Sequence, residues 1–322
     1  MAATSKVPSL HLRHRIIRLM LFRSFSRGTF DITNMLVFGT LALSCTGLLS
    51  AQGAPDDTKL LNTFQNPVGD LISVPFQNNV NFPIGKFSRI QDVLNIQPVI
   101  PFQVSEDWLI ISRWITPIVY QPNLGAACRP NGPASTELCE LREKDSQPDG
   151  GANGLGDLNP TLFLSPAHPA RLIWGFGPTF QLPTATAPTL GQGKWGAGPS
   201  IVLLTQPKHW TIGFLSNNIW SFAGNEQRRK VNQFLIQYFV TYNMEHGWFV
   251  TSSPIITANW VAPIHNEWLV PFGAGFGRIS RVGSQPVVWQ INSYYNAIHP
   301  RDLPYPKWQI RLQVALLFPA AK

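Results

Sequence analysis

Three sets of residues in this sequence have types and spacings that binding or catalytic chemistry requires. The first is GQGKWG, Gly191–Gly196, which matches the G-x-G-x-x-G pattern of dinucleotide-binding loops. Such a loop needs a helix directly after it, so that the helix amino terminus meets the phosphates. Here Gly198 and Pro199 stand where a first helical turn would be, and no acidic residue follows about 20 residues on. We therefore interpret these glycines as a corner between a loop and a strand.

The second set is a cysteine pair, Cys128 and Cys139, in a long polar connection. In an exported protein, an even pair of cysteines that closes a short loop favours a disulfide over a site. Zinc would need further ligands, and no histidine lies near the pair in sequence. We expect a Cys128–Cys139 disulfide, no metal and no cofactor.

The third set joins serines and a histidine. A lipolytic enzyme built on a barrel would need a Ser–His arrangement near the lipid boundary, for which Ser252, Ser253 and His246 are the candidates. Their spacing has no special signature. We predict that the chain is not an enzyme and keep a lipolytic barrel enzyme as the third interpretation.

The elements that must position these residues are strands with two unlike faces. From Trp308 to Phe318 every even position is large and apolar, while Gln309, Arg311 and Gln313 lie between them. Side chains alternate across a strand, whereas a helix would scatter the two sets. Eleven residues at a tilt of about 45° span about 25 Å, which is the height of the apolar band of an outer-membrane barrel. Strands of soluble proteins are usually about 5–6 residues long.

This two-faced pattern recurs about twelve times, and the connections alternate between short and long. Several short connections are followed by an aromatic residue, as at Trp108, Trp210 and Trp248, which is typical of an aromatic belt. We predict an all-β fold, a transmembrane antiparallel up-and-down β-barrel of about 12 strands. A soluble sandwich would leave sheet edges exposed, whereas a closed barrel has none. The expected strands are about 68–79, 89–103, 108–121, 154–165, 171–183, 194–205, 210–222, 231–244, 248–261, 267–280, 286–297 and 307–318.

Prolines interrupt this pattern, and each removes a donor from the strand ladder. Because lipid offers no water to replace a missing bond, we predict bulges at them. These prolines are Pro98, Pro117, Pro178, Pro199, Pro254 and Pro271.

Composition and charge agree with an exported membrane protein. Charged residues make up only 13% of the chain, against a usual share of about 25%. The formal charge of +8 is concentrated in residues 1–51, so the basic excess belongs to a leader and nucleic acid is not an expected partner. The apolar run Met35–Ala51 reads as a secretory signal. We expect a leader at 1–51, a periplasmic segment at 52–67, a barrel at 68–318 and a short tail at 319–322.

The inward face of the predicted barrel carries mostly amides and hydroxyls. Such a lumen would suit neutral or weakly anionic polar solutes. The alternative is that these groups satisfy one another in a plugged interior. The residues that we expect to line the pore are Gln97, Arg113, Gln181, Asn217, Gln237, Asn259, Asn292, Arg311 and Gln313.

Several long segments resemble those of a family of bacterial outer-membrane proteins. It is often labelled "transporter" or, by mistaken transfer of an animal peptide name, "neuromedin U". The resemblance runs from about Asn66 to Phe318 and implies an outer-membrane barrel with a transport role, but no established substrate or catalytic residue. The long leader, the cysteine-bearing connection and the tail PAAK depart from it. The matching segments include NPVGDLISVPFQNN, GLGDLNPTLFLSP, WGFGPTFQLPTAT, LGQGKWGAGPS, NQFLIQYFVTYN and QPVVWQINSYYN.

Together these observations predict a protein of the bacterial outer membrane that passes or binds small polar solutes, as a porin or transporter does. The expected partners are outer-membrane lipid, the barrel-insertion machinery and a small polar solute. A closed structural or adhesive barrel is the alternative.

Overall fold

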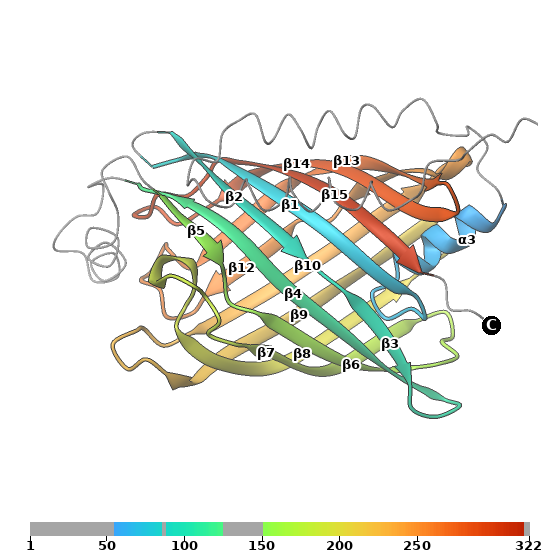
Figure 1. Cartoon of the computed structure of the whole chain (residues 1–322), viewed down its shortest axis with the longest axis horizontal. Coiled ribbons are helices and arrows are strands. Elements are labelled where there is room, and N and C mark those ends of the chain that lie inside the picture. Colours follow the sequence, from blue (N-terminus) through green and yellow to red (C-terminus); the bar gives the residue numbers. More distant parts are fainter. Residues whose placement is uncertain (1–54, 86–87, 125–150, 319–322) are drawn as a thin grey trace, which may run out of the picture. The chain divides into compact units, whose positions relative to one another are not determined.

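The computed structural model describes residues 55–85, 88–124 and 151–318, which form a closed antiparallel β-barrel (Figure 1). The expected leader at 1–51, the tail at 319–322, Cys128 and Cys139 lie outside the described residues. The strands are β1 (Ile72–Ile84), β2 (Arg89–Ile96), β3 (Val99–Gln103), β4 (Trp108–Pro122), β5 (Gly151–Leu155), β6 (Asn159–Pro166), β7 (Ile173–Gln181), β8 (Lys194–Thr205), β9 (Trp210–Gly224), β10 (Asn232–Asn243), β11 (Trp248–Ser252), β12 (Ile255–Asn259), β13 (Trp268–Val282), β14 (Gln285–Ile298) and β15 (Trp308–Phe318).

The barrel closes because β15 pairs with β1 and every other strand pairs with its neighbours. Three pairs of short strands, β2 with β3, β5 with β6 and β11 with β12, each form one interrupted strand of the wall. The described residues therefore form a wall of twelve strands, which confirms the predicted fold. The helical elements among them are α3 (Pro55–Phe64), η3 (Pro188–Leu190) and η4 (Glu245–Gly247). None of the described helices is long and apolar enough to cross a membrane.

One of the predicted bulges is found, and others are not. A bulge is found at Pro271, where the register of β13 against β14 shifts. Pro98 lies in the break between β2 and β3, and Pro254 lies between β11 and β12, but the register is the same on either side of each break, so neither forms the predicted bulge. At Pro178 and Pro199 the prediction was wrong, because these two residues face each other in unbroken register. The β8–β9 ladder instead leaves residues 198 and 199 unpaired, so a gap accommodates the missing donor.

The outward face is apolar along the barrel, and aromatic residues lie near both of its ends. Trp108, Trp210 and Trp248 are exposed directly after short turns. At the opposite end Trp260 and Trp268 are exposed and in T-shaped contact, with ring centroids 5.4 Å apart. A closed barrel with an apolar outer face and aromatic girdles is the form in which strands cross an outer membrane. The chain is therefore a protein of the bacterial outer membrane.

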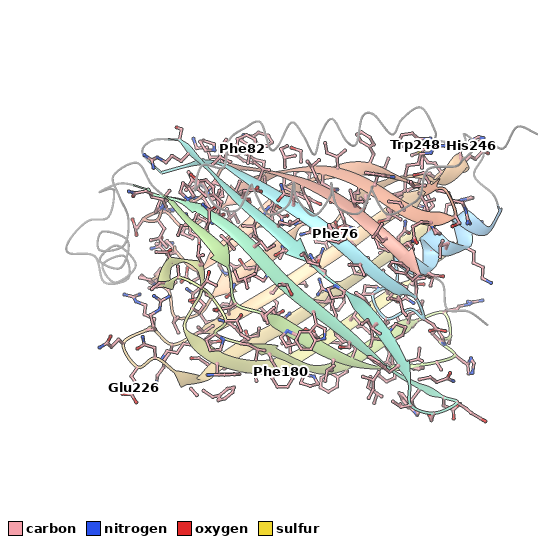
Figure 2. The ribbon with its side chains drawn as sticks, in the orientation of Figure 1. Phe76, Phe82, Phe180, Glu226, His246 and Trp248 are labelled. Carbon is pink, nitrogen blue, oxygen red and sulfur yellow. The ribbon has the colours of Figure 1, made fainter. Side chains whose placement is uncertain are left out.

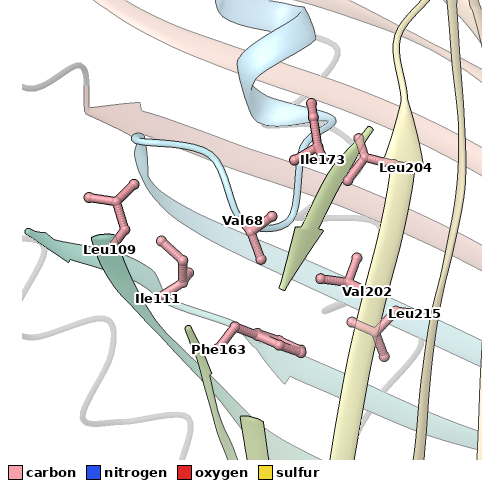
Figure 3. Packing of buried hydrophobic residues seen from close by; sticks show 8 residues of the cluster. All are labelled: Val68, Leu109, Ile111, Phe163, Ile173, Val202, Leu204 and Leu215. Carbon is pink, nitrogen blue, oxygen red and sulfur yellow. The ribbon is translucent and has the colours of Figure 1, made fainter. Parts of the chain in front are cut away.

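The two ends of the barrel differ in their connections. We call the end that carries the turns 104–107, 167–172, 206–209, 244–247 and 283–284 the short-turn end. The long-loop end carries 182–193, 225–231, 260–267 and 299–307. Side chains cluster inside the short-turn end in two apolar groups. The Val68 cluster (Figure 3) consists of Val68, Leu109, Ile111, Phe163, Ile173, Val202, Leu204 and Leu215. The Leu61 cluster consists of Leu61, Leu71, Phe249, Ile279, Val288, Ala315 and Leu317.

Candidate channel lumen

All nine residues expected to line a pore are on the inward face of the wall. The apolar clusters identify this face, since Arg113 lies two residues from Ile111 in β4 and Arg311 lies four residues from Ala315 in β15, so each pair shares one face. Residues that pair directly across neighbouring strands share a face, so the strand register assigns the inward face from one strand to the next, as in the pair Asn292 and Arg311. Whether these side chains line an open pore stays a prediction.

A band of amide side chains crosses the inward faces of β15, β1, β2 and β4 toward the long-loop end. Gln309 Nε2 donates to Asn81 Oδ1 over 2.9 Å, and Asn81 Nδ2 donates to Gln91 Oε1 over 3.0 Å. Gln91 Nε2 continues the row to Gln121 Oε1 over 2.6 Å. Each amide is at once donor and acceptor, so the band fixes the side chains of four strands relative to one another.

Arg311 is the most connected residue of this polar interior and is only 2% exposed. Its guanidinium donates to Asn79 Oδ1 over 3.0 Å, to the Ser253 carbonyl over 3.0 Å and to Gln309 Oε1 over 3.2 Å. It also lies 4.8 Å from the ring centroid of Tyr294. The Ser253 carbonyl can accept this bond because Pro254 interrupts the strand there. None of the partners described for Arg311 is a carboxylate.

Arg113 is a further inward cation and lies in β4. Its Nη2 donates to Gln97 Oε1 over 2.9 Å. Across the neighbouring strands, the hydroxyls of Thr161 and Thr179 are 2.8 Å apart. Arg113 thus lies where neutral polar groups meet the Val68 cluster, since Ile111 is two residues away on the same face.

Residues 55–71, which we call the stopper, pack against the inward face at the short-turn end. Leu61 in α3 is 1% exposed and packs against β11, β13, β14 and β15. Val68 is 3% exposed and inserts between β4, β6, β7, β8 and β9 (Figure 3). Gly175 makes room for it, because a Cβ there would lie 2.8 Å from Val68 Cγ1. The stopper therefore contacts strands around most of the barrel.

Side-chain hydrogen bonds join the stopper to the turn 206–209 and to the adjoining ends of β9 and β10. Gln65 Nε2 donates to Asn243 Oδ1 over 2.8 Å, and the Thr211 hydroxyl donates to Gln65 Oε1 over 2.8 Å. Asn243 Nδ2 donates to Asn62 Oδ1 over 2.7 Å, and Gln206 Nε2 donates to the Asn62 carbonyl over 2.7 Å. We call these five side chains the amide clasp. Among the described residues, no backbone–backbone hydrogen bond joins the stopper to the wall.

The glycine motif lies at the long-loop end and runs into β8, so it is a loop-to-strand corner as interpreted. Its backbone carbonyls accept hydrogen bonds from the guanidinium of Arg228, at Gly191 and, over 3.3 Å, at Gln192. Asp157 accepts from the Gln192 N–H over 2.6 Å and from the Ala185 N–H over 3.2 Å. A loop that presents carbonyls to a cation is not arranged to hold a pyrophosphate.

The described residues do not assemble the Ser–His arrangement. The Ser252 hydroxyl donates to the Gly273 carbonyl over 2.7 Å, and the Ser253 hydroxyl lies 3.3 Å from the Tyr294 hydroxyl. His246 is in η4 at the short-turn end, and no hydrogen bond joins it to either serine in the part of the chain described. The same residues contain no group of three or more His, Cys, Asp or Glu side chains suited to a metal.

The stopper was not predicted, because residues 52–67 were expected to form a periplasmic segment and the first strand was expected to begin at about 68. The observed strand begins at Ile72. A weak signal was present, since Leu60, Leu61 and Phe64 have helical spacing; Leu61 belongs to the Leu61 cluster, and Leu60 and Phe64 pack against it. A ten-residue helix is marginal alone and depends on such packing.

No protein-family model matches this sequence, and no curated protein is significantly similar to it. Among solved structures, an outer membrane channel from Pseudomonas putida F1 is similar over 84% of this chain and 98% of its own, with a TM-score of 0.52 and 13% identity. The toluene transporter TodX of Pseudomonas putida is similar over 80% and 91%, with a TM-score of 0.38 and 9% identity. Outer membrane phospholipase A of Escherichia coli is similar over 81% and 97%, with a TM-score of 0.37 and 10% identity. The first of these shows a shared fold.

Proposed function

We propose that this protein is an outer-membrane channel for small solutes and that the stopper closes its periplasmic end in the state described here. The observation that carries the proposal is how the stopper is held against the inward face at the short-turn end. The stopper belongs to no strand of the wall, and side-chain hydrogen bonds and apolar contacts hold it. Such a segment can move away from the wall without breaking the hydrogen bonds of the β-ladder. A wall strand cannot move without breaking them. Short turns are periplasmic in barrels of this kind.

The interior favours solutes with one polar or anionic group and an apolar part. Nearer the long-loop end, a solute meets the amide band and Arg311. Nearer the short-turn end it meets the Val68 cluster. Because Arg113 and Arg311 are inward and no described partner of either is a carboxylate, an anionic group is favoured over a cationic one.

Single-channel conductance in a planar bilayer tests this function. Gln65→Ala removes three hydrogen bonds of the amide clasp. At about 0.5–1.5 kcal/mol net for each bond, the ratio of open to closed channels should rise at least about tenfold. Thr63→Ala is the matched control, since the one hydrogen bond of its hydroxyl among the described residues is to the Lys59 carbonyl within α3. Equal open fractions in Gln65→Ala and wild type would contradict the role of the stopper.

A closed structural or adhesive barrel is the second candidate, and the satisfied polar interior favours it. Arg311 and the amide band bond to one another, as in an interior that does not conduct. The same recordings decide between the two functions. Absence of current from wild type, Gln65→Ala and a variant that also carries Val68→Ala would support the closed barrel and rule out the channel.

A further inference from the structure

We infer that Arg278, flanked by Trp248 and Trp289 on the outward face of the short-turn end, forms a binding site for the phosphate of a membrane phospholipid. Register brings the three side chains together, because Arg278 pairs with Trp248 on one side and with Trp289 on the other. All three are on the face opposite the Leu61 cluster, since they alternate with Phe249, Ile279 and Val288 along their strands. The inference does not depend on the proposed channel function.

The two indoles hold the guanidinium in place. Arg278 Cζ lies 5.3 Å from the ring centroid of Trp248, a cation–π contact. Trp248 also packs against Phe276, with ring centroids 6.3 Å apart. Trp289 is fixed by its Nε1–H, which donates to the Ser280 hydroxyl over 2.9 Å. The aromatic walls of the site are therefore ordered before a ligand arrives.

In the part of the chain that the structure describes, no residue accepts a hydrogen bond from the Arg278 guanidinium. Its Nε–H is buried without a hydrogen-bond partner, and no hydrogen bond or ion pair joins its guanidinium to a described residue. The inward arginines Arg113 and Arg311 differ, since amide or backbone oxygens accept from each of them. A guanidinium that lacks an acceptor at a lipid boundary is suited to a phosphate, which it can bind through two parallel bonds.

The position of the site favours a lipid phosphate over a free one. Trp248 is the first residue of β11 after the turn 244–247, and it lies at the end of the barrel beside His246 (Figure 2). Tryptophans at this level mark the boundary between headgroups and acyl chains. Phe276 is exposed on the same face, two residues closer to the barrel centre, where acyl chains would lie. A phosphodiester with attached acyl chains can contact both the guanidinium and this apolar surface.

Native mass spectrometry of the full chain, released from detergent with phosphatidylglycerol, tests the inference. We expect one retained lipid on wild type and at least a tenfold weaker apparent affinity in Arg278→Gln. Lys208→Gln is the matched control, because it removes the same charge from an exposed short turn at the same end. An equal loss in both variants would show that total charge attracts the lipid, which would overturn the site.

A second variant and a competitor test the forked geometry and the source of the phosphate. Arg278→Lys keeps the charge but not the forked donors, so it should bind more weakly than wild type, and binding equal to wild type would contradict the phosphate geometry.

Inorganic phosphate at millimolar concentration should not displace the lipid. Displacement would show a site for free phosphate and overturn the lipid assignment. Each variant is first checked for folding by its gel shift without heating, and Arg278→Lys replaces Arg278→Gln if the latter does not fold.

Discussion

Leu312 and Gln313 are neighbours in β15 on opposite faces of the wall, so an arginine at each position tests which solvent each face meets. Leu312 is 41% exposed on the outward face, across from Asn78. Gln313 faces inward between Gln77 and Gln290. We expect Leu312→Arg to reduce the amount of folded barrel and Gln313→Arg to leave it folded with a stronger preference for anions.

The cost of Leu312→Arg follows from its depth. Leu312 is four residues from Trp308 and six from Phe318. With a rise of about 3.4 Å per residue and a tilt of about 40°, it lies about 10 Å and about 16 Å from those ends along the membrane normal. An arginine near the midplane costs about 2–4 kcal/mol. Because Asn78 Oδ1 has no partner among the described residues and can accept one new bond, we expect about 2 kcal/mol, roughly a 30-fold fall in the ratio of folded to unfolded protein.

The cost of Gln313→Arg depends on water in the interior. Two residues along a strand separate its charge from Arg311 by about 7 Å. The repulsion is then about 0.6 kcal/mol in bulk water and about 2.4 kcal/mol at an effective dielectric constant of about 20. A hydrated interior therefore tolerates Gln313→Arg better than the membrane tolerates Leu312→Arg.

Urea titration of folding into liposomes measures both costs, and the unheated gel shift reports the folded fraction. Leu312→Met controls for the loss of leucine packing, because it nearly conserves volume. Equal destabilisation by the two arginines, or a greater loss from Gln313→Arg, would show that the faces or their solvents are assigned wrongly.

Three other changes have defined outcomes. Cys128 and Cys139 should be joined in non-reducing peptide maps, and labelling of both by a thiol reagent without reductant would disprove the disulfide. Arg311→Gln should move the reversal potential in a salt gradient toward cations, whereas an unchanged potential would mean that this cation does not face the conduction path. Asp157→Ala removes the acceptor for two backbone N–H groups of the connection 182–193. Limited proteolysis there should become about tenfold faster while the urea midpoint of the barrel changes little, and a large shift of that midpoint would contradict a local role.

The strands were predictable because a period of two is a local signal. In β15 the even residues are outward and Arg311 is inward, as the alternation indicated. A disturbance of the ladder at Pro98 was expected, since a missing donor is a property of one residue, but it is a break between two strands and not the predicted bulge. The amide clasp was not predictable, because Asn62 and Asn243 are 181 positions apart and meet only when the folded wall places β10 beside the stopper. Sequence thus indicated which side chains are inward but not which of them bond.

The stopper also constrains the order in which the chain folds. Gln65 and Thr211 are 146 positions apart, and Asn62 and Asn243 are 181 apart. Contacts of such separation form late, because their loop-closure entropy is recovered only after the strands between them are in place. Although α3 precedes every described strand in the chain, it can bind in its final position only when β8 to β15 already form their part of the wall. The amide hydrogens of α3 would then be the last to gain protection during assembly, and their exchange would show when the barrel has closed.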